Sequence, residues 1–159
     1  MVVTSCKATE TKEHTMVGCI LTGHGTFAEG VGAALEMVGG PQEDFAVVTF
    51  LEDEAAEFPE KIAGAIASMA EKCGEVVVFC DLMGGTPFNQ AMMAGAATPG
   101  VRVVTGVNLP MLLECMSMRS DGVTADELVE TAVEIGRMGV AAPVLETEAV
   151  DEPEDGEGI

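Results

Sequence analysis

Two polar side chains in this sequence have the types needed to transfer a chemical group. His24 stands between two glycines in "GCILTGHGTF", and Asp81 directly follows the apolar run "EVVVFC". A carboxylate bound to one imidazole nitrogen fixes the tautomer and leaves the lone pair of the other nitrogen facing outward. The pair therefore predicts a nucleophilic histidine oriented by an aspartate. A turn role for His24 and a capping role for Asp81 are the alternative interpretations.

The glycine-rich segment "GGTPFN" after Asp81 favours a phosphoryl group as the cargo. Gly84 and Gly85 allow close approach of the main chain, while Thr86, as the expected N-cap before Pro87, adds N–H donors and the positive end of a helix dipole. All seven Lys and Arg residues lie away from these turns in the sequence, so backbone amides would have to balance the charge. The segment lacks the G-x-x-x-x-G-K-[ST] pattern of a P-loop. No cofactor and no metal are expected.

Hydrophobic patterning predicts the elements that must position these residues. Short apolar runs at 16–21, 45–50, 75–80 and 101–106 are typical of buried strands, and each is followed by residues at helical spacing. We expect one α/β domain with an open, doubly wound, mainly parallel sheet in the order 2-1-3-4 and helices on both faces. An extra C-terminal edge strand is an optional addition to this sheet. Strands one and three would then be about 4.8 Å apart and would bring His24 and Asp81 within hydrogen-bonding reach.

Three further polar residues mark expected helix starts. Thr26 with Glu29, and Thr124 with Glu127, match the T-x-x-E pattern of a capping box. Asn108 in "GVNLP" follows the fourth predicted strand, where it fits a helix cap as well as a wall of the same crevice. The helices that follow the first, third and fourth predicted strands are therefore expected to start at the carboxyl edge of the sheet, beside His24.

Composition excludes several classes of function. The chain has 159 residues, with 27 acidic against seven basic residues and a formal net charge of −20. Nucleic acid and anionic membranes are therefore poor partners, whereas a protein with a basic face would be attracted; the acidity is equally consistent with a role in solubility alone. Five cysteines without a C-x-x-C pair indicate a reducing compartment, and no signal peptide or long apolar span is evident. A cytoplasmic location is expected.

The two ends of the chain differ in composition from its centre. Residues 1–15, which include His14, are polar and aperiodic, so they are expected to form a flexible leader. Residues 16–142 hold the predicted domain. Residues 143–159 combine a weak strand signal with a run of acidic residues, which predicts a disordered acidic tail.

Three motifs together resemble a known family. "GHGTFAEGV", "DLMGGTPFNQA" and "GVNLPMLLE" occur in the order and spacing of the enzyme IIA component of mannose-type sugar phosphotransferase systems, and the resemblance covers roughly residues 16 to 140. The resemblance implies that His24 accepts a phosphoryl group on Nε2 from the phosphocarrier HPr and passes it to a IIB protein for sugar uptake. The other implied site residues are Asp81 as the orienting carboxylate, Gly84, Gly85 and Thr86 at the phosphate, and Gly25, Thr26 and Asn108 as site walls.

The resemblance also carries expectations about assembly. It implies a homodimer, a separate IIB partner, and an indirect connection to a membrane IIC/IID complex. Two other classes stay open: a flavodoxin-like module that binds a nucleotide or flavin, and a receiver-like signalling domain. The absence of Trp and Tyr disfavours a flavin, and a receiver needs acidic residues after its first strand, where this chain has His24.

Overall fold

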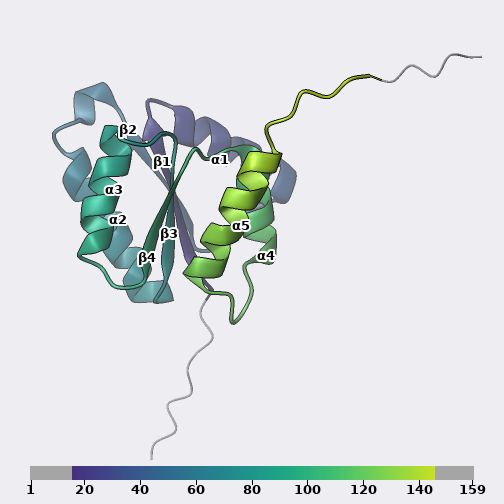
Figure 1. Ribbon diagram of the computed structural model, residues 1–159. Helices are drawn as coiled ribbons and strands as arrows, with labels where there is room; N and C mark the ends of the chain where they lie inside the picture. Colours follow the sequence, from purple (N-terminus) through teal and green to yellow (C-terminus); the bar gives the residue numbers. More distant parts are fainter. Residues whose placement is uncertain (1–15, 146–159) are drawn as a thin grey trace, which may run out of the picture.

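A four-stranded parallel sheet forms the centre of the protein, which we describe from a computed structural model over residues 16–145 (Figure 1). The strands are β1 (Gly18–His24), β2 (Phe45–Phe50), β3 (Val76–Cys80) and β4 (Val101–Thr105), in the order β2-β1-β3-β4. All three pairings are parallel. This confirms the predicted order and makes β1 and β3 the two central strands.

Helices cover both faces of the sheet. In chain order they are α1 (Phe27–Gly39), α2 (Phe58–Cys73), α3 (Thr86–Ala96), α4 (Leu109–Met118) and α5 (Ala125–Met138), and a short 3₁₀ turn, η1 (Glu52–Glu54), precedes α2. α2 packs with α3 on one face, while α4 packs with both α1 and α5 on the other, as Figure 1 shows. This arrangement confirms the doubly wound α/β fold.

The two central strands supply both layers of the hydrophobic core. Along β1, Leu21 faces the layer beneath α1, α4 and α5, whereas Ile20 faces the layer beneath α2 and α3, because successive side chains in a strand point to opposite faces. Every residue of β3 is buried. The strong burial of both strands holds their carboxyl ends in a fixed relation to each other.

Strand β1 is longer than the sequence indicates. The apolar run predicts an end at residue 21, but the strand continues to His24, which pairs with Phe50 of β2. Buried Thr22 continues the run because its hydroxyl donates to the carbonyl of Val48 at 2.7 Å. His24 is therefore the last residue of a strand and not part of a free turn.

The predicted helix starts had mixed outcomes. The Thr124–Glu127 capping box is present, with both reciprocal hydrogen bonds. The Thr26–Glu29 box was wrong, because Thr26 occupies the N-cap of α1 without a side-chain capping bond. Thr86 is the first residue of α3, so the predicted N-cap role there was also wrong, and Gly85 takes that position.

The two ends of the chain limit what can be compared. Residues 140–145, where the extra edge strand would begin, form no strand. The predicted leader at 1–15 lies outside the described residues, as do the remainder of that strand and the acidic tail from residue 146 onward. Over residues 16–145, no helix has both the length and the apolar character needed to cross a membrane.

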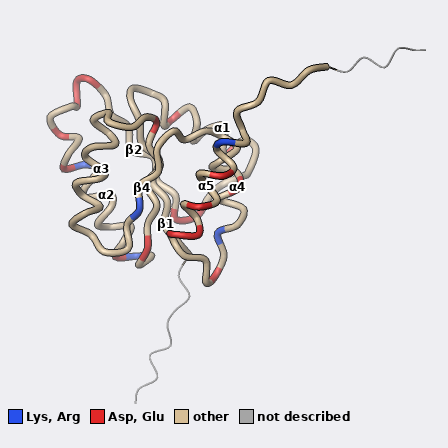
Figure 2. Tube along the Cα trace, viewed as in Figure 1, with Lys and Arg blue, Asp and Glu red and all other residues tan. Residues whose placement is uncertain are grey.

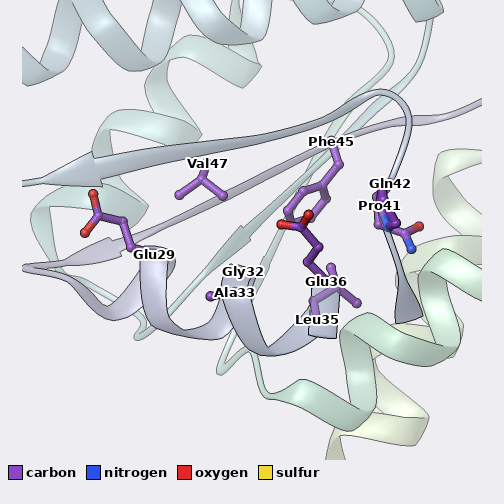
Figure 3. A pocket seen from close by; sticks show the side chains of 9 residues that line it. All are labelled: Glu29, Gly32, Ala33, Leu35, Glu36, Pro41, Gln42, Phe45 and Val47. Carbon is purple, nitrogen blue, oxygen red and sulfur yellow. The ribbon is translucent and has the colours of Figure 1, made fainter. Parts of the chain in front are cut away.

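A cavity of about 440 Å³ opens between α1 and the edge strand β2 (Figure 3). Phe45 and Val47 of β2 form one wall, and Gly32 and Leu35 of α1 form another. None of the residues predicted for the site lines this cavity. It therefore lies apart from the place where the strand ends bring polar residues together.

Candidate active site

His24 and Asp81 meet at the carboxyl ends of β1 and β3, as the sheet order requires. The Nδ1 atom of His24 lies 2.7 Å from Oδ2 of Asp81, and the same oxygen accepts the backbone N–H of His24 at 2.9 Å. The other carboxylate oxygen, Oδ1, accepts the N–H of Leu82 at 2.8 Å. One oxygen therefore holds both the main chain and the ring of the histidine, and this fixes the position of the imidazole.

The charge state of Asp81 sets the tautomer of the ring. Burial favours the neutral carboxyl, but hydrogen bonds from the backbone and ring of His24 and from the N–H of Leu82 outweigh it and lower the pKa of Asp81. An ionised carboxylate can only accept hydrogen bonds, so Nδ1 of His24 carries the proton. Nε2 then holds the free lone pair. With 42% of the His24 side chain exposed, against 10% for Asp81, the nucleophilic edge of the ring can be reached from solvent.

Two glycines make room for this pair. A methyl group added at Gly85 would lie 2.5 Å from Cε1 and 3.2 Å from Nε2 of His24, although the φ of −70° at this residue suits any amino acid. A methyl group at Gly23 would lie 2.7 Å from the Phe27 ring and 3.1 Å from the Asp81 side chain. Gly85 was predicted as a phosphate-binding residue, and its close approach to the imidazole adds a steric reason for glycine. Gly23 was missed.

The start of α3 provides hydrogen-bond donors beside the imidazole. The N–H groups of Gly85, Thr86 and Phe88 donate no hydrogen bond to any residue in 16–145, as expected for the first turn of a helix. Gly84 adopts a φ of +80°, which favours glycine, and its carbonyl accepts the side-chain N–H of Asn89 at 3.0 Å. Asn89, which the sequence analysis did not single out, therefore braces the loop that presents these donors.

The predicted wall residues have different environments. Gly25 is exposed and takes a φ of +56° directly after His24, and Thr26 is also exposed beside it. The side chain of Asn108 forms hydrogen bonds to two helices. Its Oδ1 accepts the N–H of Met111 in α4 at 3.0 Å, and its Nδ2 donates to the carbonyl of Gly136 in α5 at 2.8 Å. The side chain of Asn108 therefore caps α4 and ties it to α5, in line with the capping interpretation.

An aromatic contact completes the surroundings of the imidazole. The ring of Phe50 lies edge-on to that of His24, with centroids 5.5 Å apart and planes at 87°, and Phe50 packs in turn on Phe58 at 4.9 Å. No sequence motif pointed to Phe50. A signal was present all the same, because Phe50 ends the apolar run of β2 just as His24 ends β1.

Charged and nucleophilic groups elsewhere do not compete with His24. Within residues 16–145, no Lys or Arg forms an ion pair with Asp81, and Arg119 is buried, where it donates to the carbonyls of Val17, Glu43 and Asp44. Burial raises the pKa of the thiols of Cys19, Cys80 and Cys115 to about 12, so these thiols stay protonated at neutral pH. In the same part of the chain, no group of three or more His, Cys, Asp or Glu side chains is placed to hold a metal ion.

Comparison with known proteins places this chain in a family. A family model described as "PTS system fructose IIA component" matches residues 18–133. The mannose-specific EIIAB component of the phosphotransferase system of Escherichia coli strain K12 is 37% identical over 127 residues, which make up 79% of this chain and 39% of that protein. The fructose-specific EIIA component of Bacillus subtilis strain 168 is 33% identical over 105 residues, or 65% of this chain and 71% of that protein.

Solved structures agree with the sequence comparison. The mannose/sorbose-specific IIA subunit of Enterococcus faecalis superimposes with a TM-score of 0.70 at 32% identity, over 84% of this chain and 98% of that one. The EIIA component of Streptococcus agalactiae gives a TM-score of 0.72 at 27% identity, over 80% and 97% of the two chains. The chain spans about two fifths of the length of the E. coli relative. On sequence and fold together, this protein belongs to the fructose and mannose family of phosphotransferase system IIA components.

Proposed function

We propose that this protein is a phosphoryl carrier in which Nε2 of His24 accepts a phosphoryl group from HPr and passes it to a IIB protein during sugar uptake. The observation that carries the proposal is the double hold of Asp81 Oδ2 on the ring and the backbone of His24. That hold keeps the proton on Nδ1 and the lone pair on Nε2. Family membership supports the same conclusion.

In the proposed transfer, every bond, electron pair and proton is accounted for without a metal or cofactor. The lone pair of Nε2 forms a bond to phosphorus while the nitrogen–phosphorus bond of the phosphorylated donor histidine breaks, and the donor ring recovers its electron pair. The proton on Nδ1 of His24 stays between that nitrogen and Asp81, whose negative charge stabilises the positive charge on the ring. Transfer to IIB reverses these roles, with His24 as the leaving group.

Backbone amides of the α3 start would hold the phosphoryl oxygens. The donors of Gly85 and Thr86 lie at the positive end of the helix, which favours an anion. A site built from backbone amides alone binds phosphate with moderate affinity. This suits a phosphoryl group that is transferred to the next protein. The net charge of −20 would attract a donor protein with a basic face, and we place the exchange in the cytoplasm.

The test is phosphorylation by a reconstituted donor chain. The protein is incubated with phosphoenolpyruvate, enzyme I and HPr, and the modified residue is located by mass spectrometry. We expect one phosphoryl group on His24, lost by His24→Ala and kept by His14→Ala, which is a matched control because the chain has only two histidines. His24→Ala should fold normally, since the side chain is partly exposed at a strand end.

The chemistry of the product separates this proposal from the receiver-like alternative. A phosphohistidine is lost in acid and survives in base, whereas an acyl phosphate on Asp81 would fail most readily in base. Modification of Asp81, or full labelling of His24→Ala, would contradict the proposed role. Transfer from the labelled protein to a IIB partner is then measured as the loss of phosphate from His24.

A further inference from the structure

We propose that Phe50 is a positioning residue that sets the orientation of the His24 ring for phosphoryl transfer. This inference rests on the proposed function and adds a residue to it. Asp81 holds the ring at a single atom, Nδ1, and because a hydrogen bond tolerates a range of angles, the ring plane can still tilt by small angles about the Cβ–Cγ bond. The lone pair of Nε2 lies in the ring plane, so a tilt moves it off the line along which phosphorus must approach.

Phe50 supplies the second restraint on that tilt. Its ring lies 5.5 Å from the His24 ring at an interplanar angle of 87°, an edge-to-face arrangement that aromatic pairs favour. Gly85 approaches the same ring at Cε1. Asp81, Gly85 and Phe50 therefore limit the imidazole from three elements: the end of β3, the start of α3 and the end of β2.

Phe50 is itself held firmly enough to act as a wall. It pairs with His24 across the β1–β2 register, and its carbonyl accepts the N–H of Gly25 at 2.8 Å. Its ring packs on Phe58, which is 1% exposed at the start of α2. The contact thus connects the imidazole to the buried core through two aromatic rings.

The experiment compares leucine substitutions at the two ends of β2. Phe50→Leu removes the aromatic wall, while Phe45→Leu makes the same change at the other half-buried phenylalanine of the strand, which lines the cavity beside α1. Single-turnover phosphorylation of His24 is measured with phosphorylated HPr and with phosphoramidate, a small donor that releases ammonia as Nε2 bonds to phosphorus. The small donor removes any contribution from protein docking.

Phe50→Leu should lower the limiting rate about three- to tenfold with both donors, the size expected from losing an aromatic pair, and leave the half-saturating HPr concentration unchanged. Phe45→Leu should keep the wild-type rate, and Phe50→Tyr should restore it. The ¹⁵N spectrum of the ring should still show the proton on Nδ1 in Phe50→Leu, because Asp81 is intact. If Phe50→Leu does not fold, Phe50→Met is used in its place.

Three results would overturn the inference. These are equal rates for Phe50→Leu and wild type, equal losses for the two leucine variants, or a loss seen with HPr alone, which would make Phe50 a docking residue. In all three, wild-type His24 still takes up phosphate, so the proposed function stands. A wild-type chain that takes up none would remove the proposed function and this inference together.

Discussion

At the scale of single residues, the site combines one negative charge with close approach of neighbouring groups to the imidazole. Asp81 is the one ionised group that forms an ion pair with His24 among the described residues, and Phe50 and the glycine backbone at position 85 also lie close to the imidazole. Each of these contacts fixes the position of a ring atom or of the ring plane. Substitutions that leave the charge unchanged can therefore also disturb the chemistry.

Asp81→Asn tests the orienting charge. The amide would no longer stabilise a positive imidazole or require the proton on Nδ1, so we expect phosphoryl transfer to slow by on the order of a hundredfold or more. The free energy of unfolding should fall by only about 1–2 kcal/mol, since the amide oxygen can still accept the N–H of His24. Rapid-quench kinetics and urea unfolding of the same preparation provide both values, and unchanged kinetics would contradict the role of Asp81.

Gly85→Ala tests the close approach to the ring. The added methyl group would press on Cε1 of His24, which Asp81 prevents from moving away, so we expect at least a tenfold slower transfer and about 1–3 kcal/mol lower stability. Gly64→Ala is the matched control, because a methyl group at this position of α2 meets nothing within 4 Å. The control should keep the wild-type rate, and equal behaviour of the two variants would show that the approach at Gly85 is unimportant.

At the scale of elements, sequence patterning predicted the sheet well and the helix starts with mixed success. The apolar runs located all four strands, and the doubly wound order that best fits a chain of this length then predicted the meeting of His24 with Asp81. Capping residues compete with local alternatives that the sequence does not reveal. The extension of β1 to His24 depends on pairing with β2, a contact between segments far apart in the chain, and this pairing also explains why Phe50 was missed.

The two T-x-x-E sequences allow a direct comparison of cap energetics. Thr124→Ala removes a side-chain capping bond at the start of α5 and should lower the free energy of unfolding by about 1 kcal/mol. Thr26→Ala removes no capping bond at α1, so its effect on stability should be close to zero. Urea denaturation measures both variants, and a larger loss from Thr26→Ala would show that the α1 box forms in solution.

At the scale of the whole molecule, acidity dominates the surface. Acidic side chains outnumber basic ones 27 to seven in the full sequence, and Figure 2 shows them spread over the helices and loops around the sheet. The five basic residues described include the buried Arg119, whose bonds to three carbonyls tie the start of β1 to the start of β2. Of the other cations in residues 16–145, Lys61, Lys72 and Arg102 form ion pairs with acidic residues, and none of the five forms a hydrogen bond or ion pair with the His24–Asp81 pair.

The lowered pKa of Asp81 predicts how stability depends on pH. Its folded pKa lies below its unfolded value, so the unfolded state binds the proton first as pH falls and the contribution of Asp81 to stability is lost with it. That contribution is complete above about pH 5 and declines as pH falls through the folded pKa. The difference in unfolding free energy between wild type and Asp81→Asn should therefore shrink between about pH 5 and pH 3. A constant difference across this range would contradict the assignment.

The shared oxygen of Asp81 has a consequence for protein design. One carboxylate atom binds both the ring and the main chain of His24, so the contact between the two residues follows from two adjacent parallel strands that end beside each other. Such a pair of strands is the simplest unit of any open parallel sheet. The His24–Asp81 pair should therefore form the same contact when it is grafted at matching strand ends of an unrelated parallel sheet, with a glycine at the neighbouring helix start.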